Sequence, residues 1–338
     1  MLTRRARAIC TLKSWGMVKK MKLAYLETSV TPIIRNSPML ARLLRRIYFI
    51  QVLLGAFLGS LMADHYQQSG AAALPLVLLG VLLLPLLLQF GAISTSMIQS
   101  RPAQAGSLWW RAYGSEFLAA LRIYWLQMPW ASAQTNVLLP EGAPQAAAAP
   151  VPVLLVHGFI CNRRVWDKVV RALHQAGHPV LAITLEPPFA SIEDYTLQIQ
   201  QAVQQLQQAT GAAQVALVGH SMGGLVIRAW LRQHGSTAVA KIITLGTPHQ
   251  GTRMAVWSPT PNMAQMAWHS PWLQALQTSE SPATRKLIHT ALTRHDNIVY
   301  PQREQVLEGA EVTEFEGMGH LALCLDERVI QWLLQKLH

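Results

Sequence analysis

One short segment constrains the fold of this chain more than any other: an apolar run that ends in a serine between two glycines. Residues 214–224 read Gln-Val-Ala-Leu-Val-Gly-His-Ser-Met-Gly-Gly, and a stretch with helical spacing follows. A β-strand that turns directly into a helix leaves no room for a Cβ at Gly219 or Gly223, which explains both glycines. The segment therefore predicts a strained strand-to-helix turn that presents the Ser221 hydroxyl above the edge of a sheet.

The residues around this turn alternate between short apolar runs and amphipathic stretches. This alternation is typical of a mostly parallel sheet flanked by helices, so we expect an α/β fold over residues 151–338. The expected strands cover residues 153–156, 180–185, 215–218, 242–245, 288–293 and 312–315, and the expected helices cover residues 164–176, 194–209, 222–234 and 326–337.

Two uncharged apolar runs precede this region, at residues 47–63 and 71–93. Each is close to the roughly 20 residues that an α-helix needs to cross the hydrocarbon core of a bilayer. The basic leader before the first run is too long for a signal peptide, and that run ends without a cleavage site. We therefore expect a hairpin of two transmembrane helices over residues 47–100, in which Pro75 and Pro85 are tolerated because neighbouring groups satisfy the freed backbone.

The formal charge of +11 is concentrated at the N-terminus, where residues 1–50 hold 11 Lys and Arg residues and a single acid, Glu27. Basic residues beside a membrane span attract anionic lipid and stay in the cytoplasm, whereas the loop at residues 64–70 has no Lys or Arg. The sequence thus indicates a basic N-terminal segment at residues 1–46 and a hairpin with both ends cytoplasmic. The α/β domain is expected on the cytoplasmic side of a bacterial inner membrane. No nucleic-acid site is indicated, because the rest of the chain is nearly neutral.

The segment between the hairpin and the α/β region, residues 101–150, mixes arginines with aromatic residues. An amphipathic helix of this composition fits a membrane surface, and it fits equally well a helix that packs on the globular domain. Residues 143–150 are rich in Ala and Pro and are expected to form a linker. The mixture consists of Arg101, Arg111, Arg122, Trp109, Trp110, Tyr113, Trp125 and Trp130.

A serine hydroxyl at neutral pH needs a base to accept its proton and an acid to orient that base. After a strand-serine-helix turn of this kind, the acid comes next in the chain and the histidine follows. Asp296 lies just past an expected strand, and His320 lies in a glycine-rich loop after the last one. We therefore predict Ser221 as nucleophile, Asp296 as acid and His320 as base. The carboxylates that remain open as alternatives to Asp296 are those of Glu280, Glu304 and Glu308.

Acyl chemistry at a serine also needs hydrogen-bond donors for the developing oxyanion. The backbone N–H groups of Phe159 and Met222 are expected to supply them, because Phe159 follows the first strand and Met222 follows the serine. His157 and His220 flank these positions. We expect their rings to order the neighbouring turns and not to exchange protons during catalysis.

Five stretches of the α/β region contain the motifs that carry a family resemblance: residues 154–159, 218–224, 245–252, 294–299 and 317–323. Together they resemble bacterial lipases and carboxylesterases of the α/β-hydrolase superfamily. The resemblance implies the α/β-hydrolase fold and ester hydrolysis through an acyl-enzyme, with the triad and oxyanion positions on the residues named above. The oxyanion loop, His157-Gly158-Phe159, lacks the extended glycine run of one esterase branch, and the resemblance does not reach the hairpin.

A stretch rich in Met and Trp, residues 252–283, follows the fourth expected strand. Met and Trp provide large apolar contact area without polar demands, so this insertion would suit the cap of an acyl-chain pocket. A lipidic or otherwise hydrophobic ester is therefore the first choice of substrate, although a helical excursion that packs on the core also fits. The residues concerned are Met254, Trp257, Met263, Met266, Trp268, Trp272 and Leu273.

Two other functions fit the same residues: acyl transfer, in which an alcohol or amine takes the place of water, and a catalytically silent membrane scaffold. No cofactor or metal is indicated, because the chain has no phosphate-binding glycine loop and no paired metal-ligand spacing. Cys161 and Cys324 are expected to be buried, reduced thiols near the site. The expected partners are a hydrophobic ester and membrane lipids, and no feature of the sequence indicates an oligomeric state.

Overall fold

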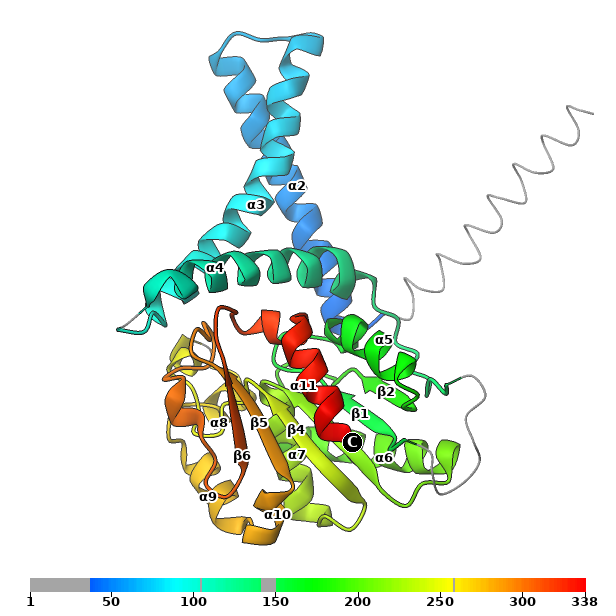
Figure 1. Ribbon diagram of the computed structural model, residues 1–338. Coiled ribbons are helices and arrows are strands. Elements are labelled where there is room, and N and C mark those ends of the chain that lie inside the picture. The colour runs from blue at the N-terminus through cyan, green and yellow to red at the C-terminus, as the bar shows by residue number, and fades with distance from the viewer. Residues whose placement is uncertain (1–36, 104, 141–149, 258) are drawn as a thin grey trace, which may run out of the picture.

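The structure consists of an α/β domain and a long helical hairpin that stands on one side of it (Figure 1). It is a computed structural model, and it describes residues 37–103, 105–140, 150–257 and 259–338. The expected basic segment lies outside the described residues up to position 36, as does the expected linker except for Pro150.

Six strands form one sheet in which every neighbouring pair is parallel, in the spatial order β2-β1-β3-β4-β5-β6. Strands that are buried on both faces read as continuous apolar runs, and all six expected strands are present, with ends that differ by at most three residues. The strands are β1 (Val153–Val156), β2 (Val180–Ile183), β3 (Val215–His220), β4 (Val239–Leu245), β5 (Ile288–Thr293) and β6 (Glu311–Phe315).

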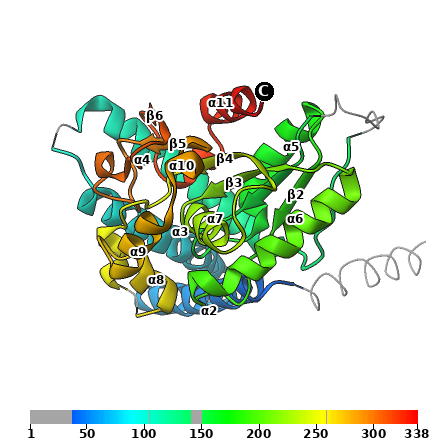
Figure 2. The same cartoon turned by 90° about the horizontal axis from the view of Figure 1, so that it is seen from below.

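Helices cover both faces of the sheet (Figure 2). The helices α5 (Asp167–Gln175) and α11 (Glu327–Leu337) lie on one face, and α6 (Thr196–Thr210) and α7 (Met222–His234) lie on the other. These four are the helices that the sequence predicts. The shorter elements are η4 (Arg163–Trp166), η5 (Ile192–Tyr195), η6 (Arg253–Trp257), α8 (Pro261–Gln265), α9 (Pro271–Ser279), α10 (Pro282–Lys286), η7 (Arg303–Gln305) and η8 (Leu321–Cys324).

The sheet separates two hydrophobic cores, because alternate residues of a strand point to opposite faces. Leu154 and Leu217 belong to the core beneath α6 and α7, which we call the closed core because its members all come from the α/β domain. Leu155 and Val218 belong to the core beneath α5 and α11. This second core continues into the hairpin, where it includes the fully buried Met97, and we call it the shared core.

The hairpin consists of α2 (Met39–His65), the short η1 (Gly70–Ala73) and α3 (Leu74–Gln99). Both long helices are apolar and long enough to cross a bilayer, and both extend beyond the expected spans, mainly toward the α/β domain. Pro85 lies inside α3, which continues through it. Most of the large apolar side chains of the hairpin are exposed.

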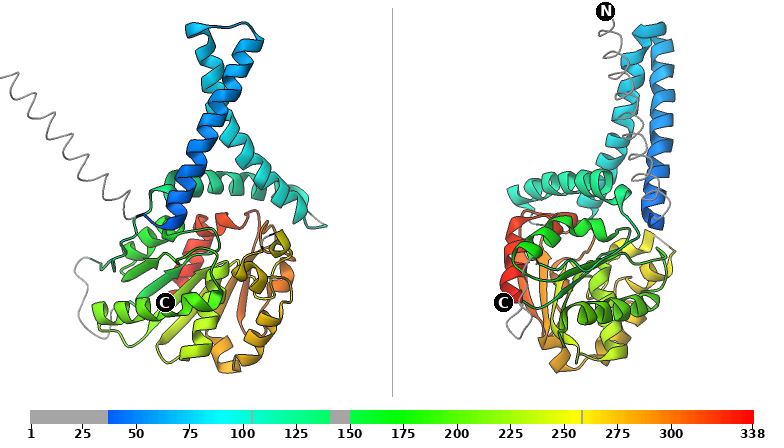
Figure 3. Two further views of the ribbon diagram at one scale, coloured as in Figure 1. Left: turned by 180° about the vertical axis from the view of Figure 1, so that it is seen from behind. Right: turned by 90° about the vertical axis from the view of Figure 1, so that its right-hand side faces the viewer.

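Glycines set the contact between the two hairpin helices. A Cβ added to Gly55 would lie 2.5 Å from the carbonyl oxygen of Gly80, and one added to Gly80 would lie 2.2 Å from the carbonyl oxygen of Gly55. Gly59 makes a similar close approach to the backbone of α3, at Leu76. Small residues spaced by four let helix backbones touch, and on the domain side of this contact α2 and α3 diverge (Figure 3).

The segment after the hairpin forms α4 (Gly106–Ala120), which continues as the π-helix η2 (Leu121–Gln127) and the short η3 (Met128–Trp130). This long helical stretch lies across the α/β domain at the foot of the hairpin (Figures 1 and 3). One side is buried in the shared core, including Ala112, Ala119 and Ile123. The other side exposes Trp110, Leu118, Leu126 and Trp130. The segment therefore packs on the domain and also presents an apolar surface.

Candidate active site

Ser221 occupies a strained turn between β3 and α7. Its backbone has φ 55° and ψ −127°, a conformation that an L-residue adopts only at a cost of about 1–3 kcal/mol. A Cβ on Gly219 would lie 2.5 Å from the nitrogen of Gly224, and one on Gly223 would lie 2.2 Å from the carbonyl oxygen of Val156. The two glycines are thus required by close backbone approaches, as the sequence predicts, and the turn holds Ser221 at the carboxyl end of the sheet.

The loop after β1 lies directly against this serine. A Cβ added to Gly158 would lie 2.6 Å from Cβ of Ser221 and 3.2 Å from its Oγ. β1 and β3 are adjacent, and the chain leaves them toward opposite edges of the sheet, which is where open parallel sheets form ligand sites. Phe159 in this loop and Met222 at the first position of α7 therefore flank Ser221, in the places from which we predict their N–H groups to act.

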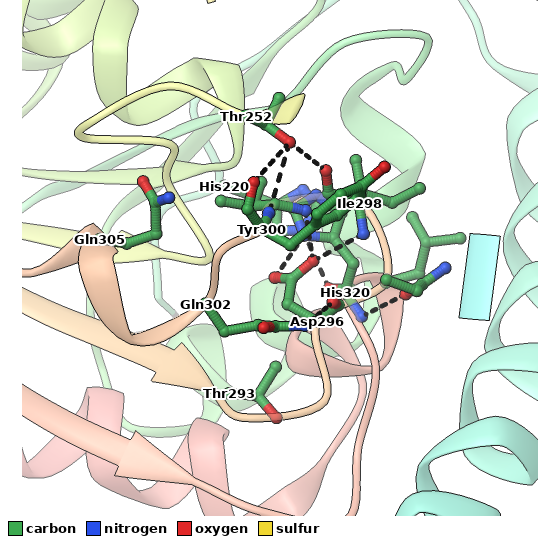
Figure 4. A network of polar contacts seen from close by, with 12 residues as sticks. His220, Thr252, Thr293, Asp296, Ile298, Tyr300, Gln302, Gln305 and His320 are labelled. Carbon is green, nitrogen blue, oxygen red and sulfur yellow. Dashed lines mark hydrogen bonds and ion pairs between the residues drawn. The ribbon is translucent and has the colours of Figure 1, made fainter. Parts of the chain in front are cut away.

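Asp296 and His320 are joined by a hydrogen bond. His320 Nδ1 lies 2.8 Å from Oδ2 of Asp296, and both side chains are buried (Figure 4). The other carboxylate oxygen of Asp296 accepts hydrogen bonds from the backbone N–H groups of Ile298 and Val299, at 2.9 and 2.7 Å. The carboxylate is therefore fixed by the turn that follows β5, and it orients the imidazole through Nδ1, which leaves Nε2 as the basic nitrogen.

The groups around His320 favour the protonated, positively charged form of its imidazole. Burial alone lowers the pKa of His320, but the negative charge of Asp296, its hydrogen bond to the ring and the negative charge of Glu116 act in the opposite direction, and the net change is upward. None of the three glutamates that the sequence leaves open as alternatives to Asp296 forms a hydrogen bond with His320 in the described part of the chain. Glu280 pairs with Arg228, and Glu304 and Glu308 are exposed.

Glu116 is a residue of the site that the sequence does not reveal. It lies on α4, is fully buried, and accepts hydrogen bonds from the backbone N–H groups of Leu321 and Ala322, at 3.0 and 3.1 Å. A Cβ on Gly319 would come within 2.6 Å of its carboxylate. Burial raises the pKa of Glu116 to about 7, against the opposing effect of these hydrogen bonds and of His320. The helix at the foot of the hairpin thus holds both sides of the His320 loop.

A second contact ties the hairpin to the Asp296 loop. Asn297 is fully buried, and its amide nitrogen donates to Oγ of Ser96 in α3 at 2.9 Å. Its amide oxygen accepts from the backbone N–H of His320 at 3.1 Å. Gln302 also connects the end of α3 to the Asp296 loop. Its amide nitrogen donates to the carbonyl oxygens of Ser100 and Asp296, each at 2.8 Å. The hairpin is therefore bonded directly to the loop that carries Asp296 and, through Asn297, to the backbone of His320.

His157 and His220 have structural contacts. Nε2 of His157 accepts from the backbone N–H of Leu185 at 2.9 Å, so Nδ1 carries the proton and donates to the carbonyl oxygen of Gly158 at 2.8 Å. Burial lowers the pKa of His157 to about 4 and lowers the pKa of His220 well below its usual value. Nε2 of His220 lies 3.1 Å from the carbonyl oxygen of His320, and the two rings are 4.5 Å apart. His220 thus orders the His320 loop as well as its own turn.

An apolar cavity of about 540 Å³ connects these groups. Ser221 and His320 line it on the side of the sheet, together with Phe159. Three methionines of the insertion after β4 also line it, namely Met254, Met263 and Met266.

The expected role of that insertion and the alternative both have support in this structure. Met263 and Met266 line the cavity and also belong to the closed core, and Leu273 of α9 lies in that core alone. Trp272 donates from its indole nitrogen to Glu193 at 2.9 Å, away from the cavity lining. The insertion is therefore a packed helical excursion whose methionines form one wall of the cavity.

The two cysteines of the α/β domain are free and buried, and Cys161 lines the cavity. Burial raises the pKa of the Cys161 thiol to about 12 and that of Cys324 well above its usual value, so neither is a nucleophile at neutral pH. Among the described residues, no group of three His, Cys, Asp or Glu side chains is placed to bind a metal ion.

Comparisons with known proteins agree with the fold that the geometry gives. Residues 152–290 match the family model of palmitoyl protein thioesterase. A triacylglycerol lipase of Burkholderia plantarii is 32% identical over 153 residues, which cover 41% of this chain and 42% of the lipase. A second triacylglycerol lipase, from Pseudarthrobacter phenanthrenivorans, is 34% identical over 118 residues, or 32% of this chain and 36% of that protein. The chain therefore spans less than half the length of these relatives.

Solved structures share the fold. The propeptide form of the lipase BlEst2 from Bacillus licheniformis superimposes with a TM-score of 0.50 at 19% identity, covering 60% of this chain and 53% of that chain. At this identity the likeness establishes the fold alone. With the parallel sheet, the serine turn and the lipase relatives taken together, this chain has the α/β-hydrolase fold and is similar to bacterial triacylglycerol lipases.

Proposed function

We propose that this protein hydrolyses carboxylic esters through an acyl-enzyme on Ser221. The observation that carries the proposal is the hydrogen bond between Asp296 and His320, together with the apolar cavity that His320 lines alongside Ser221, a serine held in a strained turn. Burying a pair of this kind costs desolvation free energy. A protein that only binds partners does not require such a pair, so its presence favours an enzyme over a binding scaffold.

The proposed reaction has two steps. As Oγ of Ser221 attacks the ester carbonyl, Nε2 of His320 takes its proton and then passes it to the leaving alcohol when the C–O bond breaks. A water molecule then attacks the acyl-enzyme, gives its proton to His320 and releases the carboxylic acid, after which Ser221 regains its proton. Asp296 holds the imidazole and stabilises its charged form, and the N–H groups of Phe159 and Met222 bind the oxyanion in both steps.

The cavity supports a substrate with a long apolar acyl group. Its lining is mostly aliphatic, aromatic and methionine side chains, and its polar members include Gln51 and Gln89 of the hairpin as well as the groups near Ser221. Triacylglycerol lipases are among the relatives, which agrees with a lipidic ester. The match to palmitoyl protein thioesterase gives a specific reason to include long-chain acyl thioesters among the substrates tested.

The hairpin supports membrane anchoring. Both helices meet the length and hydropathy expected of membrane spans, and only 17% and 6% of their apolar windows are buried within the structure. With basic residues at the start of α2 and none in the loop between the helices, the proposed topology places both ends of the hairpin, and the α/β domain, on the cytoplasmic side of a bacterial inner membrane.

A fluorophosphonate probe tests the proposed chemistry, because it reacts with activated serines. Purified full-length protein in detergent is labelled, and the adduct is located by mass spectrometry, with Ser221→Ala as the comparison. We expect one adduct, on Ser221, and none in the variant. Absence of labelling in folded wild-type protein, both in detergent and in lipid vesicles, would instead support the silent scaffold.

Hydrolysis and acyl transfer are separated by the products. Incubation with a long-chain ester in the presence of a soluble alcohol yields free carboxylic acid if water is the acceptor, and a new ester if the alcohol is. We expect carboxylic acid as the main product at alcohol concentrations far below that of water.

A further inference from the structure

The cavity above Ser221 is not confined to the α/β domain, since part of its wall is formed by the two hairpin helices. We call this part the hairpin wedge, the space between α2 and α3 on the domain side of their glycine contact. Most of its lining residues are apolar, among them Leu44, Ile47, Pro85, Leu88 and Ala92, and the amides of Gln51 and Gln89 also line it.

The glycine contact determines where the wedge begins. Gln51 lies about one helical turn from Gly55, and Pro85 lies slightly more than one turn from Gly80, in both cases toward the α/β domain. The helix backbones touch at the glycines and diverge below them, so the space between them widens toward Ser221 (Figure 3). The stretch of α3 that lines the cavity, from Pro85 to Ser96, extends for about 16 Å.

The wedge is also open to the side. Ile47 and Leu88 line the cavity, and 38% and 49% of their surfaces are nevertheless exposed. Neighbouring residues on the outer surface, such as Leu54 and Leu87, are exposed apolar side chains that would face acyl chains if the hairpin spans a bilayer. The cavity thus has an apolar opening at a level where the surrounding medium would be hydrocarbon.

We propose that the hairpin wedge binds the acyl chain of a membrane lipid ester, which enters sideways from the bilayer between α2 and α3 and reaches Ser221 without crossing water. This inference rests on the ester hydrolysis proposed above and specifies its substrate as a bilayer-resident, long-chain ester. The hairpin is then part of the substrate site as well as an anchor. An acyl chain that moves from the bilayer into this wedge passes from one apolar environment to another. It therefore avoids the free-energy cost of exposing its methylene groups to water.

A bulky side chain in the wedge tests the binding of the chain. Ala92 lines the wedge from an exposed position on α3, so Ala92→Trp would fill it, and Leu87→Trp places the same side chain on the outer surface of the same helix as a control. For full-length protein in vesicles, we expect the ratio of kcat/KM for a hexadecanoyl ester over a butanoyl ester to fall at least roughly tenfold in Ala92→Trp, because the indole would occupy space that the long chain needs and that the short chain does not reach. The ratio should stay within about twofold in Leu87→Trp. An unchanged ratio in Ala92→Trp would overturn the inference.

Crosslinking locates the chain directly and does not depend on the folding of a variant. Wild-type protein is labelled in vesicles with a fluorophosphonate that carries a long alkyl chain with a diazirine at its far end, and after illumination the crosslinked peptides are identified. The inference predicts Ser221 as the labelled residue and crosslinks to residues 44–51 of α2 or 85–96 of α3. Labelling of Ser221 with crosslinks only to the methionine insertion would overturn the wedge while leaving the hydrolase in place. Failure to label Ser221 would overturn both.

Discussion

A buried glutamate lies beside each of the two cores, and the two glutamates differ in what they bind. In the closed core, Glu280 pairs with the guanidinium of Arg228 at 2.6 Å, and both side chains are almost completely buried. In the shared core, Glu116 takes part in none of the ion pairs among the described residues and instead accepts hydrogen bonds from two backbone N–H groups of the His320 loop. The first arrangement ties α7 to the end of α9 within the α/β domain, whereas the second ties the His320 loop to α4, the helix beside the hairpin.

This difference indicates which core affects the predicted catalytic residues and which affects mainly the stability of the fold. The closed core holds the α/β domain together, but its buried ion pair touches neither Asp296 nor His320. The shared core ends at both loops, and the contacts from Ser96 and Glu116 arrive from the helical segment that precedes the α/β domain. Changes at the shared core should therefore alter activity, and changes at the closed core should alter stability first.

The largest effect is expected from a change to the pair of Asp296 and His320, at the end of the shared core. Asp296→Asn keeps the shape of the side chain but no longer stabilises the protonated imidazole, and its amide favours the wrong tautomer of His320. We expect kcat to fall by about 10⁴-fold, with little change in the thermal unfolding temperature. Ester hydrolysis and thermal denaturation of the purified variant measure the two quantities. A loss of less than tenfold would remove Asp296 from the proposed triad.

The next effect tests the closed core. Glu280→Ala leaves the fully buried Arg228 without its partner, and we expect the free energy of unfolding to fall by about 3–5 kcal/mol. Glu304→Ala, at an exposed position, is the control and should change it by less than about 0.5 kcal/mol. Chemical denaturation followed by circular dichroism provides the comparison. Equal stability of the two variants would show that the Arg228 pair does not hold this core together.

The pKa of Glu116 predicts how stability depends on pH. Because this pKa is raised to about 7 from the ordinary 4.5, the folded protein retains a proton there that the unfolded chain loses between these values. The contribution of Glu116 to stability is therefore present at low pH and declines by roughly 3 kcal/mol as the pH rises through this window. In Glu116→Gln, which cannot ionise, the decline in unfolding free energy between pH 4.5 and 7 should be smaller by that amount. An identical pH profile in wild type and variant would contradict the assignment.

The smallest effect concerns the bond between the hairpin and the Asp296 loop. Ser96→Ala removes the acceptor for the amide nitrogen of Asn297, and we expect a loss of about 1 kcal/mol in unfolding free energy, with a few-fold decrease in kcat/KM. Ser60→Ala removes a hydroxyl that bonds only within α2, at the carbonyl oxygen of Ala56, and serves as the control. If both variants have the same kcat/KM as wild type, this bond does not position the loop.

Much of the α/β domain is predictable from the sequence because its signals are local. Strands buried on both faces read as apolar runs, and the position of Ser221 follows from backbone crowding at Gly219 and Gly223. Asp296 and His320 are predictable because each lies just past the carboxyl end of a strand, and parallel strands bring these ends to one edge of the sheet.

The part of the site contributed by the helical segment is not predictable in this way. An amphipathic pattern shows that Glu116 lies on a helix, but it does not show that this residue contacts an amide 205 positions further along the chain. The apolar runs of α2 and α3 indicate membrane spans, yet their pattern does not show that the ends nearest the domain line the same cavity as Ser221. The local signal that was available is the spacing of Gly55 and Gly59, which indicates a close helix crossing.

The most direct test of the account is to trap the covalent intermediate with a substrate. Full-length protein in vesicles is mixed with a long-chain ester, the reaction is stopped with acid within the first turnovers, and peptides are mapped by mass spectrometry alongside measurement of the released acid. The account predicts an acyl group on Ser221 in wild-type protein, and neither adduct nor ester turnover above background in Ser221→Ala. Ester turnover by Ser221→Ala at the wild-type rate would contradict it.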